Sequence, residues 1–272
     1  MSHKQGDRDL SGVTNLYLHA GETFMLNTII KQLSLDYCCS EADVMDCENH
    51  FSEYKPLNGR RMFYDTRGEI FLKIAVINGK LLVSGRNDII TVLADTLNGV
   101  DGAWFMEAEM LVRLNEIIAG YGYQIKQAHP FYVAETCSKV NTEGFDIVWY
   151  NESEIKTLFS DDERFDEAFV FCDAAPDIIG VAALNDKEIL GMAGANSESP
   201  YMWQIGVNTM DPHKSKGIGS MLVTLLKNAV LERGVIPYYG TSISHIASQR
   251  LALKAGFLPM WAELITSNKK GQ

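Results

Sequence analysis

The sequence predicts a protein of the α+β class with mixed α/β character. Three features support this prediction: turn residues separate two pairs of strand-like runs, longer segments carry apolar residues at helical spacing, and the C-terminal part alternates strands with helices. With 272 residues, the chain is long enough for one large domain or two smaller ones.

The N-terminal part, up to about residue 135, is predicted to mix helices and strands. The expected elements are a helix in 27–37, two strands in 69–85 around an Asn78-Gly79 turn, a helix in 84–99, and a helix in 104–122 that ends at Gly120 and Gly122. In the 84–99 helix, the apolar residues expected near one face are Ile89, Ile90, Val92 and Leu93.

A polar stretch at residues 134–144 (AETCSKVNTEG) is the predicted boundary between two regions. We therefore expect an N-terminal α+β region over residues 1–138 and a second domain over residues 139–272. Beyond the boundary, the expected elements are a hairpin in 177–195 that turns at Asn185-Asp186, strands in 201–210, 235–243 and 257–266, and helices in 219–234 and 245–256. The last five of these form a β-α-β-α-β succession.

The most distinctive stretch is HKSKGIGSML, residues 213–222, between a predicted strand and a predicted helix. A helix begins with backbone N–H groups that lack an internal partner and with the positive end of its dipole. Gly217 and Gly219 would let the backbone approach an anion, while Lys214 and Lys216 add positive charge. On these residues alone two interpretations stay open: a phosphate-binding turn, or an ordinary helix start with solvated lysines. The stretch matches neither a P-loop nor a dinucleotide fingerprint.

Composition argues against several classes of function. With 35 Asp and Glu against 24 Lys and Arg, the chain has no global charge that would attract nucleic acid or membrane phosphates, so any anion must be bound locally. The five cysteines show neither CxxC spacing nor a neighbouring histidine cluster, so we expect no disulfide framework and no metal site. The polar start and the lack of a membrane-length apolar run predict a cytoplasmic protein.

Two motifs in the C-terminal part resemble those of the GNAT superfamily of acyl-CoA-dependent N-acyltransferases. KSKGIG (214–219) is similar to the acyl-CoA motif of the family, with Lys214 in the place of the usual Arg or Gln. SISHIASQRLALKAGF (242–257) is similar to the later motif: Ser248 and Gly256-Phe257 fit, and His245 stands where Asn is usual. The resemblance covers about residues 145–266 and implies a central mixed β-sheet flanked by helices.

The resemblance also implies a site for acetyl-CoA, or another acyl-CoA, as co-substrate, with no metal. The strand before the turn would splay from its neighbour and offer backbone groups to the pantetheine arm, and the turn would hold the pyrophosphate. The residues that it assigns to acyl-CoA are Asn208, Thr209, Met210, Lys214, Ser215, Lys216, Gly217, Ile218, Gly219, Ser220, His245 and Ser248. A neutral amine would attack the thioester carbonyl directly, so proximity supplies much of the rate.

The sequence departs from the family pattern at the acid and base positions. Ala252 stands where many members carry a Tyr that protonates the departing thiolate, and the strand residues 201–204 (YMWQ) include no Glu that could act as a base. His245 and Tyr239 are the remaining candidates for catalysis, with Tyr238 as a third. A packing or cofactor-contact role is the favoured alternative for each of them.

Three functions therefore stay open. One is an N-acetyltransferase that moves an acetyl group from acetyl-CoA to a primary amine of a small molecule or peptide. The second is a catalytically weak or inactive acyl-CoA-binding regulator. The third is nucleotide binding without acyl transfer, which protection from heat by ATP or NAD, and not by CoA, would support. Nucleic acid and membranes are not expected partners, and the acceptor and the oligomeric state are not predicted. Gly219→Asp is expected to abolish CoA binding without disturbing the fold, because the carboxylate would repel the pyrophosphate.

The N-terminal region, residues 1–138, resembles the extra N-terminal region of larger members of the family and carries no motif of its own. Its aromatic residues are expected in the core rather than in an acceptor pocket; they are Trp104, Phe105, Phe131 and Tyr132.

Overall fold

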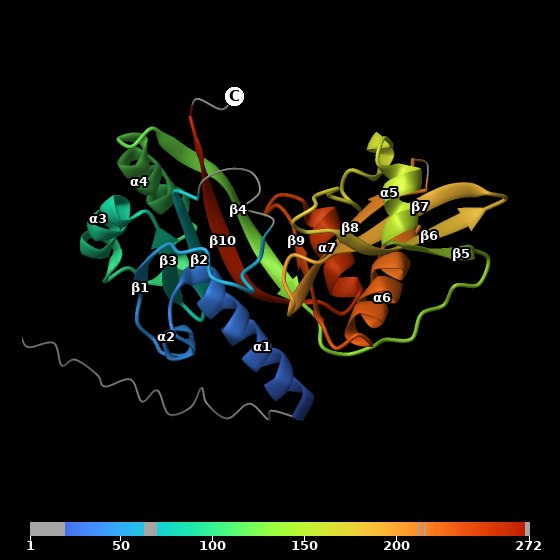
Figure 1. Cartoon of the computed structure of the whole chain (residues 1–272), viewed down its shortest axis with the longest axis horizontal. Helices are drawn as coiled ribbons and strands as arrows, with labels where there is room; N and C mark the ends of the chain where they lie inside the picture. Colours follow the sequence, from blue (N-terminus) through green and yellow to red (C-terminus); the bar gives the residue numbers. More distant parts are fainter. Residues whose placement is uncertain (1–19, 63–69, 212, 215, 270–272) are drawn as a thin grey trace, which may run out of the picture.

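The computed structural model describes residues 20–62, 70–211, 213–214 and 216–269, which form a mixed β-sheet with helices on both faces (Figure 1). The N-terminal elements are α1 (Ala20–Tyr37), α2 (Glu41–Met45), β1 (His50–Glu53), β2 (Leu72–Ile77), β3 (Lys80–Gly85), α3 (Asn87–Leu97), the 3₁₀ helix η3 (Gly102–Trp104), α4 (Ala108–Ala119) and β4 (Tyr123–Val133). The C-terminal elements are β5 (Asp146–Asn151), α5 (Glu152–Phe159), the 3₁₀ helix η4 (Glu163–Phe165), β6 (Asp177–Asn185), β7 (Glu188–Asn196), β8 (Met202–Thr209), α6 (Ile218–Leu231), β9 (Ile236–Gly240), α7 (Ile246–Lys254) and β10 (Leu258–Asn268). The α+β class is confirmed.

The helices and hairpins expected from strong periodicity are present. Asn78 and Gly79 both have positive φ between β2 and β3. The β6–β7 hairpin turns at Asp186 and Lys187, which have positive φ as well, one residue later than the expected Asn185-Asp186 turn, because Asn185 still pairs with Glu188. Gly234 and Gly256, predicted at the ends of two helices, follow α6 and α7 with φ of 73° and 87°.

Two expectations about the N-terminal region are wrong in part. Val92 is exposed, because the buried side of α3 is formed by Ile89, Ile90, Leu93 and Leu97. Trp104 is 66% exposed, since the chain from residue 102 forms a short 3₁₀ turn before α4 begins at Ala108. Phe105, Phe131 and Tyr132 lie in the core as expected.

The two halves of the chain exchange strands within one sheet. Its strand order is β1-β3-β2-β10-β4-β9-β8-β7-β6-β5. β10, from the C-terminal half, is antiparallel to both β2 and β4, and β4, from the N-terminal half, lies between β10 and β9. Figure 1 shows β4 and β10 as long strands between α3 and α4 on one side and α5–α7 on the other. Neither half therefore has a complete sheet of its own.

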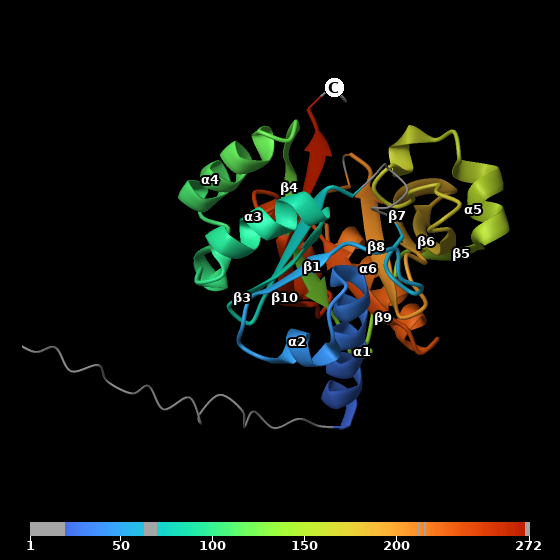
Figure 2. The same cartoon turned by 60° about the vertical axis from the view of Figure 1, so that its left-hand side comes forward.

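Helices cover both faces of this sheet, as the second view also shows (Figure 2). α1 packs on the face of β2 and β3 that carries Ala75 and Leu82, whereas α3 and α4 cover the opposite face. In the C-terminal half, α6 and α7 pack on one face of β6–β8 and α5 on the other. Within the described residues, no helix combines the length and the apolar character that crossing a membrane requires.

Candidate functional site

The sheet opens between β8 and β9. The two strands are parallel partners over only three positions, the last of which pairs Gln204 with Tyr238. Beyond this pair, β8 continues beside β7 to Thr209, while β9 stays with β4 through Gly240. We call this opening, which begins at the Gln204–Tyr238 pair, the fork.

Backbone alternation decides which groups of β8 face the fork. The Tyr201 C=O accepts a hydrogen bond from the Ile236 N–H at the start of β9, and the Met210 N–H donates to the Leu190 oxygen on β7 at 2.9 Å. Because the backbone groups of successive strand residues point to opposite edges, those of Val207 and Thr209 face the fork. The backbone of Asn208, like that of Met210, faces β7.

This alternation corrects part of the sequence expectation. We expected Met210 to offer its backbone groups to a ligand. Its backbone N–H instead donates a hydrogen bond to β7. The side chain of Asn208 is also engaged, because its Oδ1 accepts hydrogen bonds from the backbone N–H groups of Glu167 and Ala168 at 3.1 and 2.7 Å. It thereby holds segment 166–169 against β8.

The start of α6 lies directly after β8 and its loop. Gly217 is the N-terminal cap with φ 87°, a left-handed conformation that favours glycine, and no side chain of the described residues caps the helix. The backbone N–H groups of Ile218, Gly219 and Ser220 therefore have no acceptor within the helix. Lys216 is exposed beside them, so this helix start is suited to an anion.

The other residues of the turn have varied surroundings. Lys214 is exposed and lies 3.3 Å from the Asp211 carboxylate, and the Ser220 hydroxyl donates to the Gly217 oxygen at 2.9 Å. Ser215 lies outside the described residues. A Cβ at Gly219 would lie 2.7 Å from Leu251 Cδ1 and 3.1 Å from Thr209 Oγ1, so Gly219→Asp would also require the Leu251 side chain to move. The effect of Gly219→Asp on CoA binding and on the fold stays a prediction.

The start of α7 brings together two of the predicted residues. The Tyr239 hydroxyl, buried next to the fork, hydrogen bonds with the Ser248 hydroxyl at 2.9 Å, and the buried Ala252 follows Ser248 one helical turn later. Burial raises the pKa of Tyr239, and the negative charge of Glu167 raises it further. His245 is exposed at the N-cap position of α7 and makes no capping hydrogen bond with its side chain.

Segment 166–169 crosses the sheet on the side of the fork opposite α6. It lies over three glycines that are direct neighbours in the strand register: Gly180, Gly194 and Gly206. A Cβ at Gly206 would overlap the Glu167 backbone oxygen, so the segment lies this close only because these positions lack side chains. The chain here, SDDERFDE at 160–167, is strongly acidic.

A buried carboxyl that the sequence analysis missed lies at the base of the fork. Glu198 precedes β8 and is fully buried, and its Oε2 accepts a short hydrogen bond from the Tyr238 hydroxyl. Among the described residues, its Oε1 has no hydrogen-bond partner. Burial raises the pKa of Glu198 to about 7, although Arg61 and the Tyr238 hydroxyl act in the opposite direction.

Residues of the N-terminal half surround this carboxyl. The Arg61 Nε lies 2.6 Å from Asp36 Oδ2 of α1, and Arg61 Nη2 pairs closely with Glu263 of β10. The guanidinium carbon of Arg61 also lies 5.5 Å from the ring centroid of Tyr238. The backbone N–H of Met62 donates to the backbone oxygen of Glu198 at 2.9 Å. Only the fold brings these groups together, so no local motif could have revealed Glu198.

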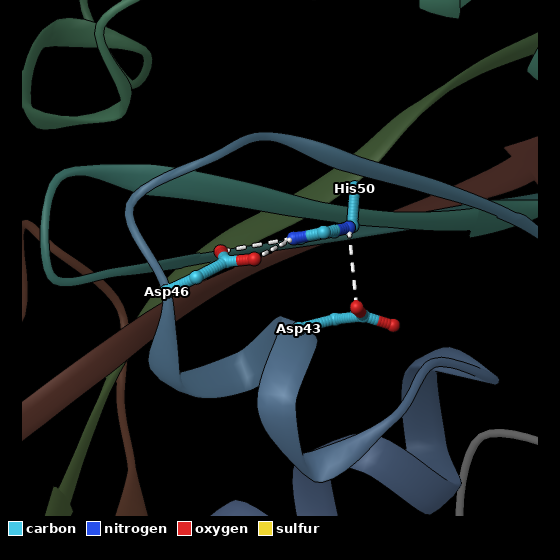
Figure 3. Close-up of side chains that lie close together, drawn as sticks. All are labelled: Asp43, Asp46 and His50. Atoms are coloured by element: carbon cyan, nitrogen blue, oxygen red, sulfur yellow. Dashed lines mark hydrogen bonds and ion pairs between the residues drawn. The ribbon is translucent and has the colours of Figure 1, made fainter.

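A second cluster of charged groups lies on the N-terminal half. His50 Nε2 is 2.9 Å from Asp46, and His50 Nδ1 is 3.8 Å from Asp43 (Figure 3). The buried Lys80 ammonium lies 2.8 Å from Asp46, and hydrogen bonding to it holds the pKa of Asp46 well below its usual range. This ammonium already supplies the positive charge that a metal ion would bring.

The fork and the start of α6 together suit an extended ligand that carries an anionic group. In the sequence, residues 145–257 match the model of the Acetyltransferase (GNAT) family, a stretch of less than half of the chain. Residues before 145 lie outside the match. No curated protein matches the sequence.

Several solved structures are similar to this chain at low identity. A GCN5-related N-acetyltransferase-like protein from Streptococcus suis is 17% identical with a TM-score of 0.40, over 57% of this chain and 67% of that one. A GCN5-related N-acetyltransferase from Sphaerobacter thermophilus is 15% identical with a TM-score of 0.42, over 60% of this chain and 57% of that one. A Salmonella typhimurium protein, described with its cofactor acetyl-CoA, is 13% identical with a TM-score of 0.33, over 47% of this chain and 95% of that one. This chain thus covers less than two thirds of the Sphaerobacter protein.

Proposed function

We propose that this protein is an N-acetyltransferase that moves the acetyl group of acetyl-CoA to a primary amine of a small molecule or peptide. The match of residues 145–257 to the GNAT family supports acyl transfer, and the description of the Salmonella protein with acetyl-CoA supports the acyl donor. The observation that carries the proposal is the fork. There the backbone of β8 faces away from β7 without pairing with β9, and the uncapped start of α6 follows β8.

The residues around the fork fit acetyl-CoA as a substrate. The backbone groups of Val207 and Thr209 face the fork, a position from which they can pair with the amide groups of a pantetheine arm. The N–H groups from Ile218 to Ser220 suit the pyrophosphate, with Lys214 and Lys216 adding positive charge. Gly217 leaves open space beside them, since a Cβ there would meet no atom within 4 Å.

The chemistry requires a neutral amine and a proton for the departing thiolate. The amine nitrogen attacks the thioester carbonyl and the new C–N bond forms as the C–S bond breaks. The nitrogen loses one proton and the departing thiolate gains one, so the proton from the nitrogen restores the group that donates to sulfur. Tyr239, hydrogen bonded to Ser248 beside the fork, is the proposed donor of that proton in place of the side chain that Ala252 lacks. His245 is the other candidate, and its exposure at the start of α7 suits contact with the cofactor better.

Thermal unfolding with and without acetyl-CoA tests the donor. A ligand that binds only the folded state stabilises it by mass action, about 2.7 kcal/mol at 100 times the dissociation constant. We expect acetyl-CoA, and neither ATP nor NAD, to raise the unfolding midpoint. Lys216→Glu should weaken this shift without changing the midpoint of the free protein, because Lys216 is exposed. Equal shifts with all three ligands would contradict an acyl-CoA site.

Ala252 favours a second candidate, an acyl-CoA-binding regulator with little or no catalysis. It is fully buried and has no acidic proton to give, so this chain lacks the usual donor of its family at that position. Thiol release from acetyl-CoA against a panel of primary amines separates the two candidates. Binding without turnover of any amine would support the regulator.

A further inference from the structure

Glu198, Tyr238 and Gln204 form a hydrogen-bonded chain at the base of the fork. The hydroxyl of Tyr238 donates to Glu198 Oε2 and lies 3.4 Å from Gln204 Oε1. Glu198 and Tyr238 are fully buried, whereas Gln204 is partly exposed. The chain thus leads from a carboxyl without solvent contact to an amide group at the point where β8 and β9 separate.

The direction of this chain depends on the protonation of Glu198. When the carboxyl is ionised, the single proton of the Tyr238 hydroxyl goes to Glu198 and leaves the Gln204 oxygen free to accept another donor. When the carboxyl is protonated, it donates to the Tyr238 oxygen, and the Tyr238 hydroxyl then donates to Gln204. A proton delivered to the Tyr238 oxygen from the side of Gln204 therefore brings the hydroxyl proton of Tyr238 to Glu198 without any large movement of these side chains.

The charges around Glu198 allow both states. The nearest charged groups are two carboxylates and one guanidinium: Asp36 of α1, Glu263 of β10 and Arg61. Without Glu198, this cluster therefore holds one more carboxylate than guanidinium. His129 of β4 lies opposite Glu263 in the strand register, and burial lowers its pKa, which favours its neutral form. Burial and the two carboxylates disfavour a charge on Glu198, whereas Arg61 and Tyr238 stabilise it.

We propose that Glu198, acting through the Tyr238 hydroxyl, accepts the proton that an alkylammonium acceptor loses before it attacks acetyl-CoA. This inference rests on the proposed function. The ammonium donates to Gln204 Oε1 and passes one proton to the Tyr238 oxygen as the hydroxyl proton of Tyr238 moves to Glu198. The N–H bond breaks, the carboxylate becomes a carboxylic acid, and the neutral amine is left at the fork. After product release, Glu198 returns the proton to solvent by the reverse path.

The acceptor class follows from this arrangement. An alkylamine carries a positive charge at neutral pH because its pKa is close to the value of about 10.4 for lysine. Such an acceptor needs a base, and the acidic segment 160–167 beside β8 favours a cation over an anion. An amine that is already neutral needs no help from Glu198. The residue therefore distinguishes acceptors by charge rather than by shape.

Glu198→Gln tests the inference with two acceptors that differ mainly in charge. One is an alkylamine, and the other is its analogue with fluorine atoms on the carbon next to the amine-bearing carbon, which is neutral at pH 7. Loss of a general base typically costs 10²–10⁴-fold. We expect kcat/KM to fall about 10²-fold or more for the alkylamine and to change less than about threefold for the fluorinated amine. Tyr238→Phe should show the same pattern.

Asp177→Asn is the matched control. Asp177 is also a buried carboxyl, with its pKa raised to about 6 by burial, but it accepts hydrogen bonds from the backbone N–H groups of Val170 and Phe171, away from Tyr238. In this variant, kcat/KM should change by the same factor for both amines, or should stay unchanged for both. The wild-type pH profile with the alkylamine should show an inflection near pH 7, which Glu198→Gln removes and Asp177→Asn keeps.

Each other outcome overturns the inference. Equal losses for both amines in Glu198→Gln would assign the residue a structural role, and full activity with both would remove it from the reaction. If the wild-type protein binds acetyl-CoA but acetylates neither amine, the proposed function fails and this inference fails with it. A proton count on the free protein gives an independent readout: wild type should titrate one more buried carboxyl near pH 7 than Glu198→Gln does.

Discussion

Gly217 is the residue on which the local geometry of the α6 start depends. Its φ of 87° is unfavourable for any residue with a Cβ, yet the space around it is open. Gly217→Ala should therefore cost about 1 kcal/mol through backbone strain and disturb the N–H groups that follow. We expect weaker acetyl-CoA binding, measured by titration calorimetry.

Gly234 provides the control for that variant. It has φ 73° and equally open surroundings, but it follows the other end of α6. Gly234→Ala should lose similar stability while keeping its affinity for acetyl-CoA. If both variants lose affinity alike, the effect comes from strain in α6 and not from the start of the helix.

The lysine–glycine turn could be found from the sequence because its residues are consecutive and their chemistry is local. Glu198 could not be found in this way. Tyr238, which donates a hydrogen bond to Glu198, is 40 residues away in the sequence. Arg61 and Glu263, which pair beside Glu198, are 202 residues apart. The burial of Glu198 therefore depends on the assembled fold. The contact between the Gly219 position and Leu251 of α7 has the same origin, since only the fold brings α7 beside the start of α6.

Among the elements, β4 and β10 connect the two halves. β10 pairs with β2 on one side and with β4 on the other, and both of these strands come from the N-terminal half. β9, from the C-terminal half, pairs with β4 as well. Fragments 1–138 and 139–272, cut at the boundary that the sequence suggested, should each fail to fold alone. An equimolar mixture should regain helical and sheet signals in circular dichroism. A folded 1–138 fragment by itself would show that the exchange is not needed.

The sequence predicted elements with strong periodicity, such as α6 and the β2–β3 hairpin, but not the place of β4 in the sheet. Turn residues and helical spacing act over a few residues, so they are visible in a short window. The pairing of β4 with β9 and β10 joins residues more than 100 positions apart, and nothing in the alternation of a strand specifies so distant a partner.

For the whole molecule, two buried carboxyls with raised pKa, Glu198 and Asp177, predict how stability depends on pH. The pKa of Glu198 is raised from 4.5 to about 7 in the folded state, so folding binds a proton between these values. Its contribution is fully present below the unfolded pKa and is lost as the pH rises through 7. Asp177, raised from 3.8 to about 6, acts in the same direction.

Urea unfolding at pH 5 and pH 8 measures this effect. The free energy of unfolding should fall over this interval by about 2–4 kcal/mol on account of Glu198. Glu198→Gln should remove most of the fall and be no less stable than wild type at pH 8, because a neutral side chain suits the buried site. The stabilising pair of Asp46 with Lys80 does not interfere, since the lowered pKa of Asp46 keeps it ionised throughout. An unchanged slope in the variant would contradict the assignment.

The position of β10 between β2 and β4 also sets the order of events during synthesis. The ribosome makes β10 after every other strand described here, so β2 and β4 stay without their shared neighbour until then. Their exposed edges invite pairing with other nascent chains. We infer that the N-terminal half completes its part of the sheet only after β10 has been made, and that a chaperone which shields strand edges would raise its yield in the cell.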